Sequence, residues 1–347
     1  MGGRPGNEDD TILIRRTPAA APVGRRPFLY AGLGGAAALL LAAGFGAFWW
    51  QRRAKPIPIG TATEAEIDQT QPCDTIVTYL APDKSVVVID FPSLLSQGLT
   101  LDRVAAFVEK AHVPHNSVLD DAALRTAIAA SGDTMSSYYY GHDYQAADLA
   151  RFFALAQSEN VALYPQELWL RQLLRQLGWL QPGATGAIIT LPAAGGDISP
   201  EMRAVILRHE ISHGAFYTVP EYRHYAERFW ASLTPADRAA FTGFLGRQGY
   251  DTSLTELMLN ETQAYLIFTR DPRFFNAAAI GKTEAEVNQL RQGFIANMPN
   301  FWLTPLATEP LPPVPQSMPA CPPKQAMLTV GHKRLCLCYR RGGFECG

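Results

Sequence analysis

The chain has 347 residues, enough for one large or two modest domains, and 47% of them are hydrophobic, enough for a substantial core. Its 30 basic and 32 acidic side chains leave a formal net charge of −2 at pH 7. Because this balance gives no basic surface for nucleic acid, we expect no DNA or RNA partner.

Residues 1–26 are polar and rich in glycine, proline and arginine, a composition that predicts a disordered tail. An acidic cluster, Glu8-Asp9-Asp10, stands before Thr11 within this tail. A phosphorylated Thr11 could recruit a phosphothreonine-recognition domain, although an unstructured solvated tail is the interpretation we favour.

Residues 27–50 are predicted to be a transmembrane anchor or signal-anchor. No charged residue occurs across the 23 positions 28–50, which matches the ~20 apolar residues of a membrane-spanning helix. Arg25-Arg26 precede this segment, and Trp49-Trp50 and Arg52-Arg53 end and follow it, as suits a bilayer interface. We favour an uncleaved anchor over a cleaved signal peptide, because the apolar run ends in bulky aromatic residues rather than at a small-x-small site.

The run Arg25-Arg26-Pro27-Phe28-Leu29 also resembles the twin-arginine export motif, with Tyr30 where that motif usually has lysine. The resemblance implies export of an already folded, metal-loaded domain. Residues 1–26 would then remain in the cytoplasm, and the rest would lie on the periplasmic or extracytoplasmic side as part of a single-pass membrane protein.

Residues 51–72 form a polar linker, and residues 73–185 are predicted to be a small β-hairpin followed by a helical subdomain. The hairpin strands are Thr75–Leu80 and Ser85–Phe91. The helices are indicated by three apolar stripes at helical spacing: Leu101, Val104, Ala105 and Val108; Leu149, Phe152, Phe153 and Ala156; Leu170, Leu173, Leu174 and Leu177. The aromatic run Tyr138–Tyr144 could line a substrate cleft, but a turn between helices with packed tyrosines is favoured.

Residues 186–303 are predicted to be the catalytic domain. Gly186–Leu191 is typical of a short strand. A helix is then predicted to begin at Ser199, which can cap it, with Pro200 at the first helical position. Two further helices are expected at 220–233 and 235–248.

The stretch Arg208–Gly214 contains the pattern His-Glu-x-x-His, formed by His209, Glu210 and His213. Residues four apart on a helix lie one turn apart on the same face, so both imidazoles can bind one Zn²⁺ while Glu210 lies beside its open coordination position. The pattern predicts a site for metal-assisted hydrolysis.

A catalytic zinc site usually has a third protein ligand, and Glu261 is the candidate. It falls on the apolar stripe of a helix predicted around residues 254–268, where a buried carboxylate needs a cation or a hydrogen-bond donor. Glu256 is the competitor, but Ser253 and Glu256 together are typical of a capping box at the start of the same helix.

The run Ile206–Ala215 resembles the extended zincin signature, and Leu259–Ala264 is similar to the second gluzincin motif, whose glutamate completes the site. The resemblance covers about residues 186–268. It implies a zincin-like core in which an edge strand before the metal helix, here Gly186–Leu191, holds the substrate backbone by strand addition. The 47 residues between His213 and Glu261 exceed the usual spacing, so no subfamily is assigned.

This family resemblance implies one Zn²⁺ per chain, held by His209, His213 and Glu261, and a peptide or protein as substrate. Glu210 would act as general base and pass the proton to the leaving amine. Tyr217 and Tyr265 are the candidate oxyanion donors. The expected fold class is α+β and mostly helical, with an active-site helix, a small sheet and a helical N-terminal subdomain.

Residues 304–347 are predicted to be an extended tail rich in proline and cysteine, running over the surface. Four of the five cysteines lie there, and outside the cytoplasm disulfides are expected, in a pairing that the sequence leaves open: Cys73, Cys321, Cys336, Cys338 and Cys346. A second zinc site at His332, Cys336, Cys338 and Cys346 is the less favoured alternative, because the spacing is not a standard one.

The sequence therefore predicts a membrane-anchored, zinc-dependent metallopeptidase. The alternative is a catalytically inactive zincin-like protein that binds a partner or serves as a scaffold in the cell envelope.

Overall fold

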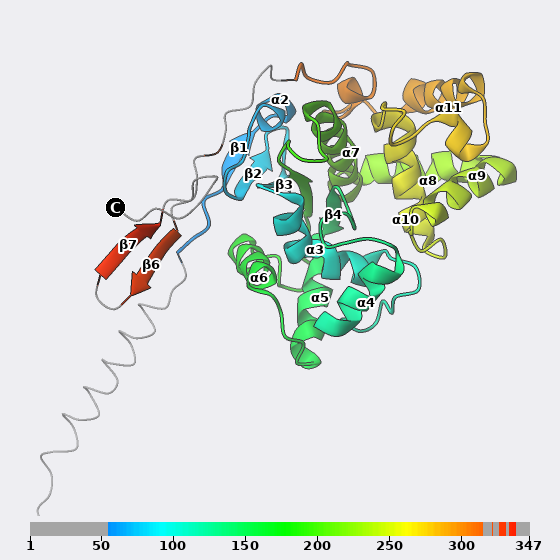
Figure 1. Cartoon of the computed structure of the whole chain (residues 1–347). Coiled ribbons are helices and arrows are strands. Elements are labelled where there is room, and N and C mark those ends of the chain that lie inside the picture. Colours follow the sequence, from blue (N-terminus) through cyan, green and yellow to red (C-terminus); the bar gives the residue numbers. More distant parts are fainter. Residues whose placement is uncertain (1–54, 315–320, 322–325, 331–332, 338–347) are drawn as a thin grey trace, which may run out of the picture. The chain divides into compact units, whose positions relative to one another are not determined.

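The computed structural model describes residues 55–314, 321, 326–330 and 333–337, and only the backbone of the last two ranges. Residues 56–314 belong to one unit. Its fold is α+β and about 52% helical, with one small mixed sheet of five strands (Figure 1). The predicted α+β, mostly helical class is confirmed.

The sheet combines three early strands with two later ones. Their bounds are β1 Gly60–Ala62, β2 Ile76–Leu80, β3 Asp83–Phe91, β4 His142–Gln145 and β5 Ala187–Pro192. The spatial order is β1-β2-β3-β5-β4. The antiparallel pair β2 and β3 is the predicted hairpin, and β5 lies parallel to β3 and antiparallel to β4. One sheet thus joins the segments 73–185 and 186–303.

β5 coincides with the strand predicted at Gly186–Leu191, but it is not an edge strand. It lies between β3 and β4, so β4 forms the edge on that side. All six residues of β5 are buried, as is typical of an interior strand covered on both faces. The prediction of an edge strand at this position is wrong, because the short polar strand β4 was not recognised.

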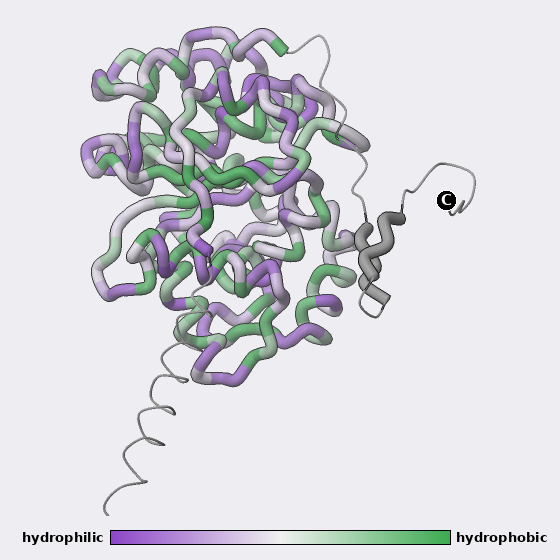
Figure 2. The backbone as a smooth tube through the Cα atoms, turned by 90° about the vertical axis from the view of Figure 1, so that its left-hand side faces the viewer, coloured by the Kyte–Doolittle hydropathy of each residue, from purple (hydrophilic) through white to green (hydrophobic). Residues whose placement is uncertain are grey.

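Two hydrophobic clusters cover the two faces of the sheet. Val86 and Val88 of β3 belong to the cluster that contains the core of helix α7 (Pro200–Thr218), whereas Val87 and Ile89 belong to the cluster on the other face. The alternation follows from the pleat, which directs successive side chains to opposite faces. Figure 2 shows hydrophobic stretches through the middle of the body, where these strands lie.

Four helices lie between β3 and β5 in the chain: α3 Leu94–Val108, α4 Asp121–Ala130, α5 Ala146–Ser158 and α6 Pro165–Leu177. The three predicted apolar stripes lie in α3, α5 and α6, and these helices form the second cluster with Val87 and Ile89. Arg103 of α3 and Glu167 of α6 make a buried ion pair, with 2.7 Å between Nε and Oε1.

Helix α7 carries the His-Glu-x-x-His pattern. Its N-terminus is the predicted one, since the Ser199 hydroxyl accepts a hydrogen bond from the Met202 backbone N–H. Gly214 lies where α7 approaches the sheet most closely: a Cβ there would stand 2.8 Å from Cγ1 of Val86. The glycine therefore lets the helix rest directly on β3.

Arg203 fixes α7 to the sheet. Its guanidinium, fully buried, donates to both carboxylate oxygens of Asp90 on β3, at 2.9 and 2.7 Å. It also donates to the carbonyls of Pro192, at 2.6 Å, and Ile67, at 2.9 Å. One side chain thus joins α7, β3, the end of β5 and helix α2 (Glu64–Asp68).

Arg208 precedes the first histidine of the pattern and contacts α2 and the segment after η3. Its guanidinium binds the Glu64 carboxylate at 2.7 and 3.0 Å. It also donates to the carbonyls of Glu309, at 2.6 Å, and Pro310, at 3.1 Å. The start of the proline-rich tail therefore packs against the helix that bears the site.

The remaining elements follow α7 in the chain: α8 Pro220–Ser232, α9 Pro235–Arg247, α10 Thr255–Gln263, the π-helix η1 Ala264–Phe268, the 3₁₀ helix η2 Ala277–Ile280, α11 Glu284–Asn297 and the 3₁₀ helix η3 Thr304–Ala307. The helices predicted at 220–233 and 235–248 are α8 and α9.

The predicted capping box at α10 is wrong, because Leu254 is the N-cap and makes no side-chain bond. Glu256 instead pairs with Arg223, at 2.6 Å.

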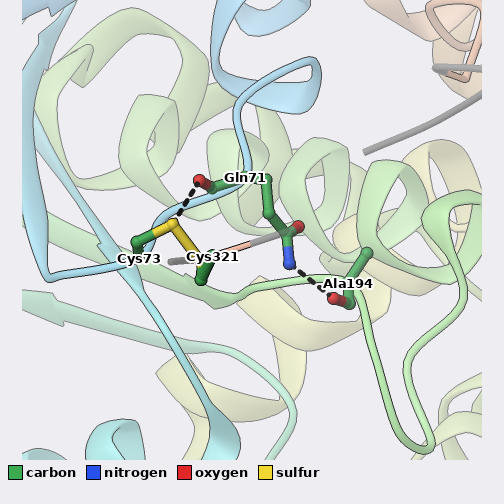
Figure 3. Close-up of a disulfide and its surroundings, with 4 residues drawn as sticks. All are labelled: Gln71, Cys73, Ala194 and Cys321. Atoms are coloured by element: carbon green, nitrogen blue, oxygen red, sulfur yellow. Dashed lines mark hydrogen bonds between the residues drawn. A yellow bond between two sulfur atoms is a disulfide. The ribbon is translucent and has the colours of Figure 1, made fainter. Parts of the chain in front are cut away.

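A disulfide joins Cys73 to Cys321, 248 residues apart in sequence (Figure 3). Beside it, the Gln71 amide donates to the Ala194 carbonyl at 2.9 Å, which fastens the same segment to the chain after β5.

The alternative zinc site predicted in the tail lies outside the described residues. This applies to the side chain of Cys336 and to all of His332, Cys338 and Cys346. Strands β6 (Ala326–Val330) and β7 (Lys333–Leu337) form an antiparallel hairpin.

Within the described ranges, none of the helices combines the length and the apolar character needed to cross a membrane. The anchor predicted at residues 28–50 and the threonine at position 11 both lie outside those ranges.

Replacing Arg203 by Leu is expected to lower the free energy of unfolding by about 3–5 kcal/mol, because the Asp90 carboxylate would stay buried without its partner. Urea denaturation followed by circular dichroism measures the change. The control is Arg125→Ala, which removes an exposed i,i+4 pair with Asp121 and should leave stability unchanged. Equal effects of the two substitutions would contradict the role given to Arg203.

Candidate metal centre

Two helices bring the three predicted ligands together. His209 and His213 project from successive turns of α7, and Glu261 projects from α10. The two Nε2 atoms are 3.0 Å apart. The Glu261 carboxylate places one oxygen 3.7 Å from Nε2 of His209 and the other 3.7 Å from Nε2 of His213.

These separations fit one metal ion. A Zn²⁺ ion binds histidine nitrogen and carboxylate oxygen at about 2.0–2.2 Å, so two ligand atoms of the same ion are at most about 4.2 Å apart. All three pairs meet this limit. Oε2 of Glu261 is buried and has no hydrogen-bond partner in the described part of the chain, as expected of an atom that faces a cation site.

The surroundings of His209 fix its tautomer. The Thr269 hydroxyl donates to the Ala264 carbonyl at 3.0 Å, so its oxygen is free to accept a bond from Nδ1–H of His209, at 2.7 Å. The proton therefore resides on Nδ1, and the Nε2 lone pair points toward His213 and Glu261. Thr269 follows directly on η1, so the wide turn of the π-helix helps to place its hydroxyl.

Both imidazoles are neutral near pH 7. Burial lowers the pKa of His213 to about 4. Burial, with the adjacent His213 as a second cause, lowers the pKa of His209 well below its ordinary value. Neutral imidazole is the form that ligates a metal. Nδ1 of His213 faces the Asp143 carboxylate of β4 at 3.7 Å, the position of a group that orients a metal-bound histidine.

Glu210 lies beside His209 at the cleft. Its Oε2 is buried without a hydrogen-bond partner among the described residues, and its side chain lines the cleft. Burial, followed by the charges of Asp143, Glu261 and Glu109, raises its pKa well above the ordinary value. A Cβ at Gly141 would lie 2.1 Å from Oε1 of Glu210, so only glycine leaves room for this carboxyl.

The cleft beside Glu210 has a volume of about 620 Å³. One wall is formed by the segment that leads into β4, and the other by the segment after α9 and by η1 and the residues that follow it. Its aromatic lining consists of Tyr138, Tyr139, Tyr140, Tyr250, Tyr265 and Phe274. The ring centroids of Tyr140 and Phe274 are 6.4 Å apart, so these two side chains meet edge to face.

The aromatic run Tyr138–Tyr144 is therefore not a turn between helices, as favoured from sequence. Its first half lines the cleft, and its second half is the edge strand β4. The strand was missed because it has only four residues and alternates charged or polar side chains with a tyrosine.

The two tyrosines predicted as oxyanion donors differ in position. Tyr265 lines the cleft, and its ring centroid is 4.8 Å from that of His209. Tyr217 does not line the cleft; it hydrogen-bonds Asp143, and burial raises its pKa well above the ordinary value. Only Tyr265 is placed to contact a molecule bound beside Glu210.

Sequence reasoning missed four residues of the site: Glu109, Asp143, Tyr250 and Thr269. Burial raises the pKa of Asp143 to about 8, and burial together with the charge of Asp143 raises the pKa of Glu109 to about 8. Tyr250 lines the cleft and hydrogen-bonds Glu261. Only the unusual density of aromatic residues between 138 and 144 could have drawn attention to Asp143.

Comparisons of the chain with protein-family models, with curated proteins and with solved structures returned no match. The assignment of a function therefore depends on the chemistry of the site.

The metal-free chain is expected to lose stability as the pH rises from about 7 to about 9. The buried carboxyls of Glu109 and Asp143 have pKa values of about 8 when folded, whereas unfolded carboxyls have ordinary pKa values of about 4. The folded state thus keeps protons that the unfolded state has already lost, so a rise in pH lowers stability until these protons are released as well, and the dependence levels off above about 8. The histidines are largely neutral in both states over this range.

Urea unfolding in the presence of a chelator measures this dependence. Glu109→Gln and Asp143→Asn should each make it weaker, and Glu221→Gln, at an exposed position, should not. A wild-type stability that is constant or increases over this range would contradict the assignment of the raised pKa values.

Proposed function

We propose that this chain is a zinc-dependent metallopeptidase of the gluzincin type. The observation that carries the proposal is the convergence of both Nε2 atoms and the Glu261 carboxylate within 3.7 Å, with Glu210 next to them on the wall of the cleft. Two nitrogen ligands and one oxygen ligand, with a position left open, are the usual donor set of a catalytic zinc site. Bound Zn²⁺ would supply Lewis acidity, which activates water and polarises a carbonyl group.

Glu210 is the proposed general base. Its unpartnered oxygen could accept a proton from the attacking water and then deliver this proton to the leaving amine. Burial has already raised the pKa of this carboxyl, which suits a group that must both take and give a proton near neutral pH. Thr269 and Asp143 would orient the two histidine ligands, and Tyr265 would donate to the developing oxyanion.

The proposed substrate is a peptide or protein bound in extended form along β4. This strand is at the sheet edge, so its outer backbone groups are available for pairing with another strand. Gly141, which precedes β4, is adjacent to Glu210, so a peptide paired there would pass the general base. The aromatic lining of the cleft suits an apolar side chain of such a peptide.

We further propose that residues 28–50 anchor the enzyme in a membrane, with the catalytic unit on the periplasmic or extracytoplasmic side. The disulfide between Cys73 and Cys321 supports this location, since disulfides persist mainly in oxidising compartments. Binding of a phosphothreonine-recognition domain at Thr11 remains a prediction from sequence.

Glu210→Gln should retain zinc and lose hydrolysis by a factor of about 10²–10⁴, because the variant keeps its shape but cannot accept the proton. The measurement is cleavage of a peptide library by the full chain, followed by mass spectrometry, with zinc content determined on the same sample. Glu256→Gln is the control and should cleave normally. Activity retained by Glu210→Gln would exclude the mechanism.

The full chain, purified without added chelator, should contain one zinc per chain. Glu261→Ala should lose it, whereas Glu256→Ala should keep it, because Glu256 lies away from the ligands in an exposed pair with Arg223. Plasma mass spectrometry gives the content. Absence of zinc from the wild type would leave the alternative of a partner-binding or scaffold protein, and zinc without cleavage of any peptide would leave an inactive zincin-like protein.

A further inference from the structure

A second group of buried carboxylates adjoins the proposed zinc site. Glu109, Asp143 and Glu261 each offer one oxygen, and these atoms all lie within 4.8 Å of one another. The three side chains come from different elements: the C-cap of α3, the edge strand β4 and helix α10. Glu261 alone belongs to both groups.

These carboxylates have no cationic side chain to balance them. In the described part of the chain, none of the three is within 4.0 Å of a lysine or arginine nitrogen, and only histidines approach Asp143 and Glu261 that closely. Lys110, directly after Glu109, instead places its ammonium over the rings of Tyr138 and Tyr139, 4.2 and 4.4 Å from their centroids. Burying carboxylates without a counter-charge is costly.

Glu109 is placed unfavourably in a second respect. It is the C-cap residue of α3, the end of a helix at which partial negative charge accumulates, and it is only 4% exposed. Its orientation is nevertheless well defined, because the Tyr144 hydroxyl donates to Oε1 at 2.9 Å and in turn contacts Nδ1 of His142 at 3.0 Å. A carboxylate oriented in this way by a hydrogen-bond chain is typical of a metal ligand.

Independent of the carboxylates as a cluster, buried polar atoms directed at the same region lack partners. Oε2 of Glu210, which lies outside the group and is only 5% exposed, has no hydrogen-bond partner in the described residues, and the same holds for Oε2 of Glu261. Glu210, Asp143 and His213 each offer one ligand atom, and these atoms lie within 4.8 Å of one another. Glu210 thus adds a fourth buried carboxylate to the region.

We propose that Glu109, Asp143 and Glu261 bind a second cation, of the hard, oxygen-preferring class and the size of Ca²⁺, beside the zinc site and sharing Glu261 with it. Calcium binds oxygen at about 2.3–2.6 Å in flexible geometry, which suits three carboxylates held by three different elements, whereas Mg²⁺ requires near-ideal octahedral geometry at about 2.0–2.1 Å. The second site depends on the proposed function in one respect: Glu261 would be a ligand of both ions.

The second ion would connect the end of α3, β4 and α10, the three elements that carry its ligands. It would balance the charge of Glu109 and Asp143 and hold the edge strand in place beside Glu210. Bound cation is thus expected to stabilise the cleft itself.

The test is calorimetric titration of the zinc-loaded full chain with Ca²⁺, with zinc content measured before and after. The wild type should bind one Ca²⁺ with a submillimolar dissociation constant, in the range of extracellular calcium modules. Mg²⁺ should bind at least about tenfold more weakly. Calcium should also raise the thermal midpoint of the wild type.

Glu109→Gln should weaken Ca²⁺ binding at least about tenfold and keep its zinc, since glutamine preserves shape and loses the charge. Asp143→Asn should show the same loss, which keeps the test valid if one variant does not fold. Asp102→Asn is the matched control: Asp102 is also buried on α3, with both oxygens unpartnered in the described residues, but lies outside the carboxylate group. It should bind Ca²⁺ as the wild type does.

Zinc without any Ca²⁺ binding in the wild type, or calcium binding unaffected in both Glu109→Gln and Asp143→Asn, would overturn the second site and leave the proposed function intact. Calcium binding that depends on Glu109, in a chain that contains no zinc, would overturn the proposed function and leave the second site intact. The two failures are therefore distinguishable.

Discussion

The burial of several carboxyl groups beneath one helix is the constraint on which the rest of the structure depends. Glu109, Asp143, Glu210 and Glu261 meet under α7 together with two neutral imidazoles. Such a group is tolerated only if the surrounding elements are held rigidly and if something compensates the charge. The sheet, α3 and α10 each contribute a member, so their packing and the chemistry of the site are inseparable.

Two other buried carboxylates are compensated within the molecule. Arg203 binds Asp90 through two hydrogen bonds, and Arg103 binds Glu167, so each pair carries its own compensation. These pairs connect helices and strands and need nothing from outside. The group under α7 has no guanidinium or ammonium partner within the described residues, and this contrast supports the proposal that the group binds cations.

Much of the helical structure could be predicted because its signals are local. The Ser199 cap, the stripe in α3 and the buried position of Glu261 depend on residues within one or two turns. The edge strand β4 could not be predicted, because it is defined only by pairing with β5, more than 40 residues later. The largely apolar sequence of β5 gave no sign that a polar strand would pair with its other edge.

The residues of the candidate site also differ in whether a local signal in the sequence identifies them. His209, Glu210 and His213 form a pattern within five residues, and Glu261 was found because a carboxylate interrupts an apolar stripe. Glu109 could not be found, since an acidic residue just after a helix usually indicates a solvated end. Glu256 was predicted to have a structural role in a capping box. It does have a structural role, but as the ion-pair partner of Arg223.

The disulfide joins Cys73 to Cys321, 248 residues apart in the sequence, and every residue of the site lies in the loop that it closes. In the chain-entropy model, closing a loop of this length lowers the conformational entropy of the unfolded chain. The folded state is thereby stabilised by about 5 kcal/mol. The disulfide has another effect if the chain is cut by a protease: a single backbone break anywhere inside the loop yields two pieces that stay covalently joined. A nicked molecule could therefore keep the residues of the candidate site together, and their separation would require a second cut or a reductant.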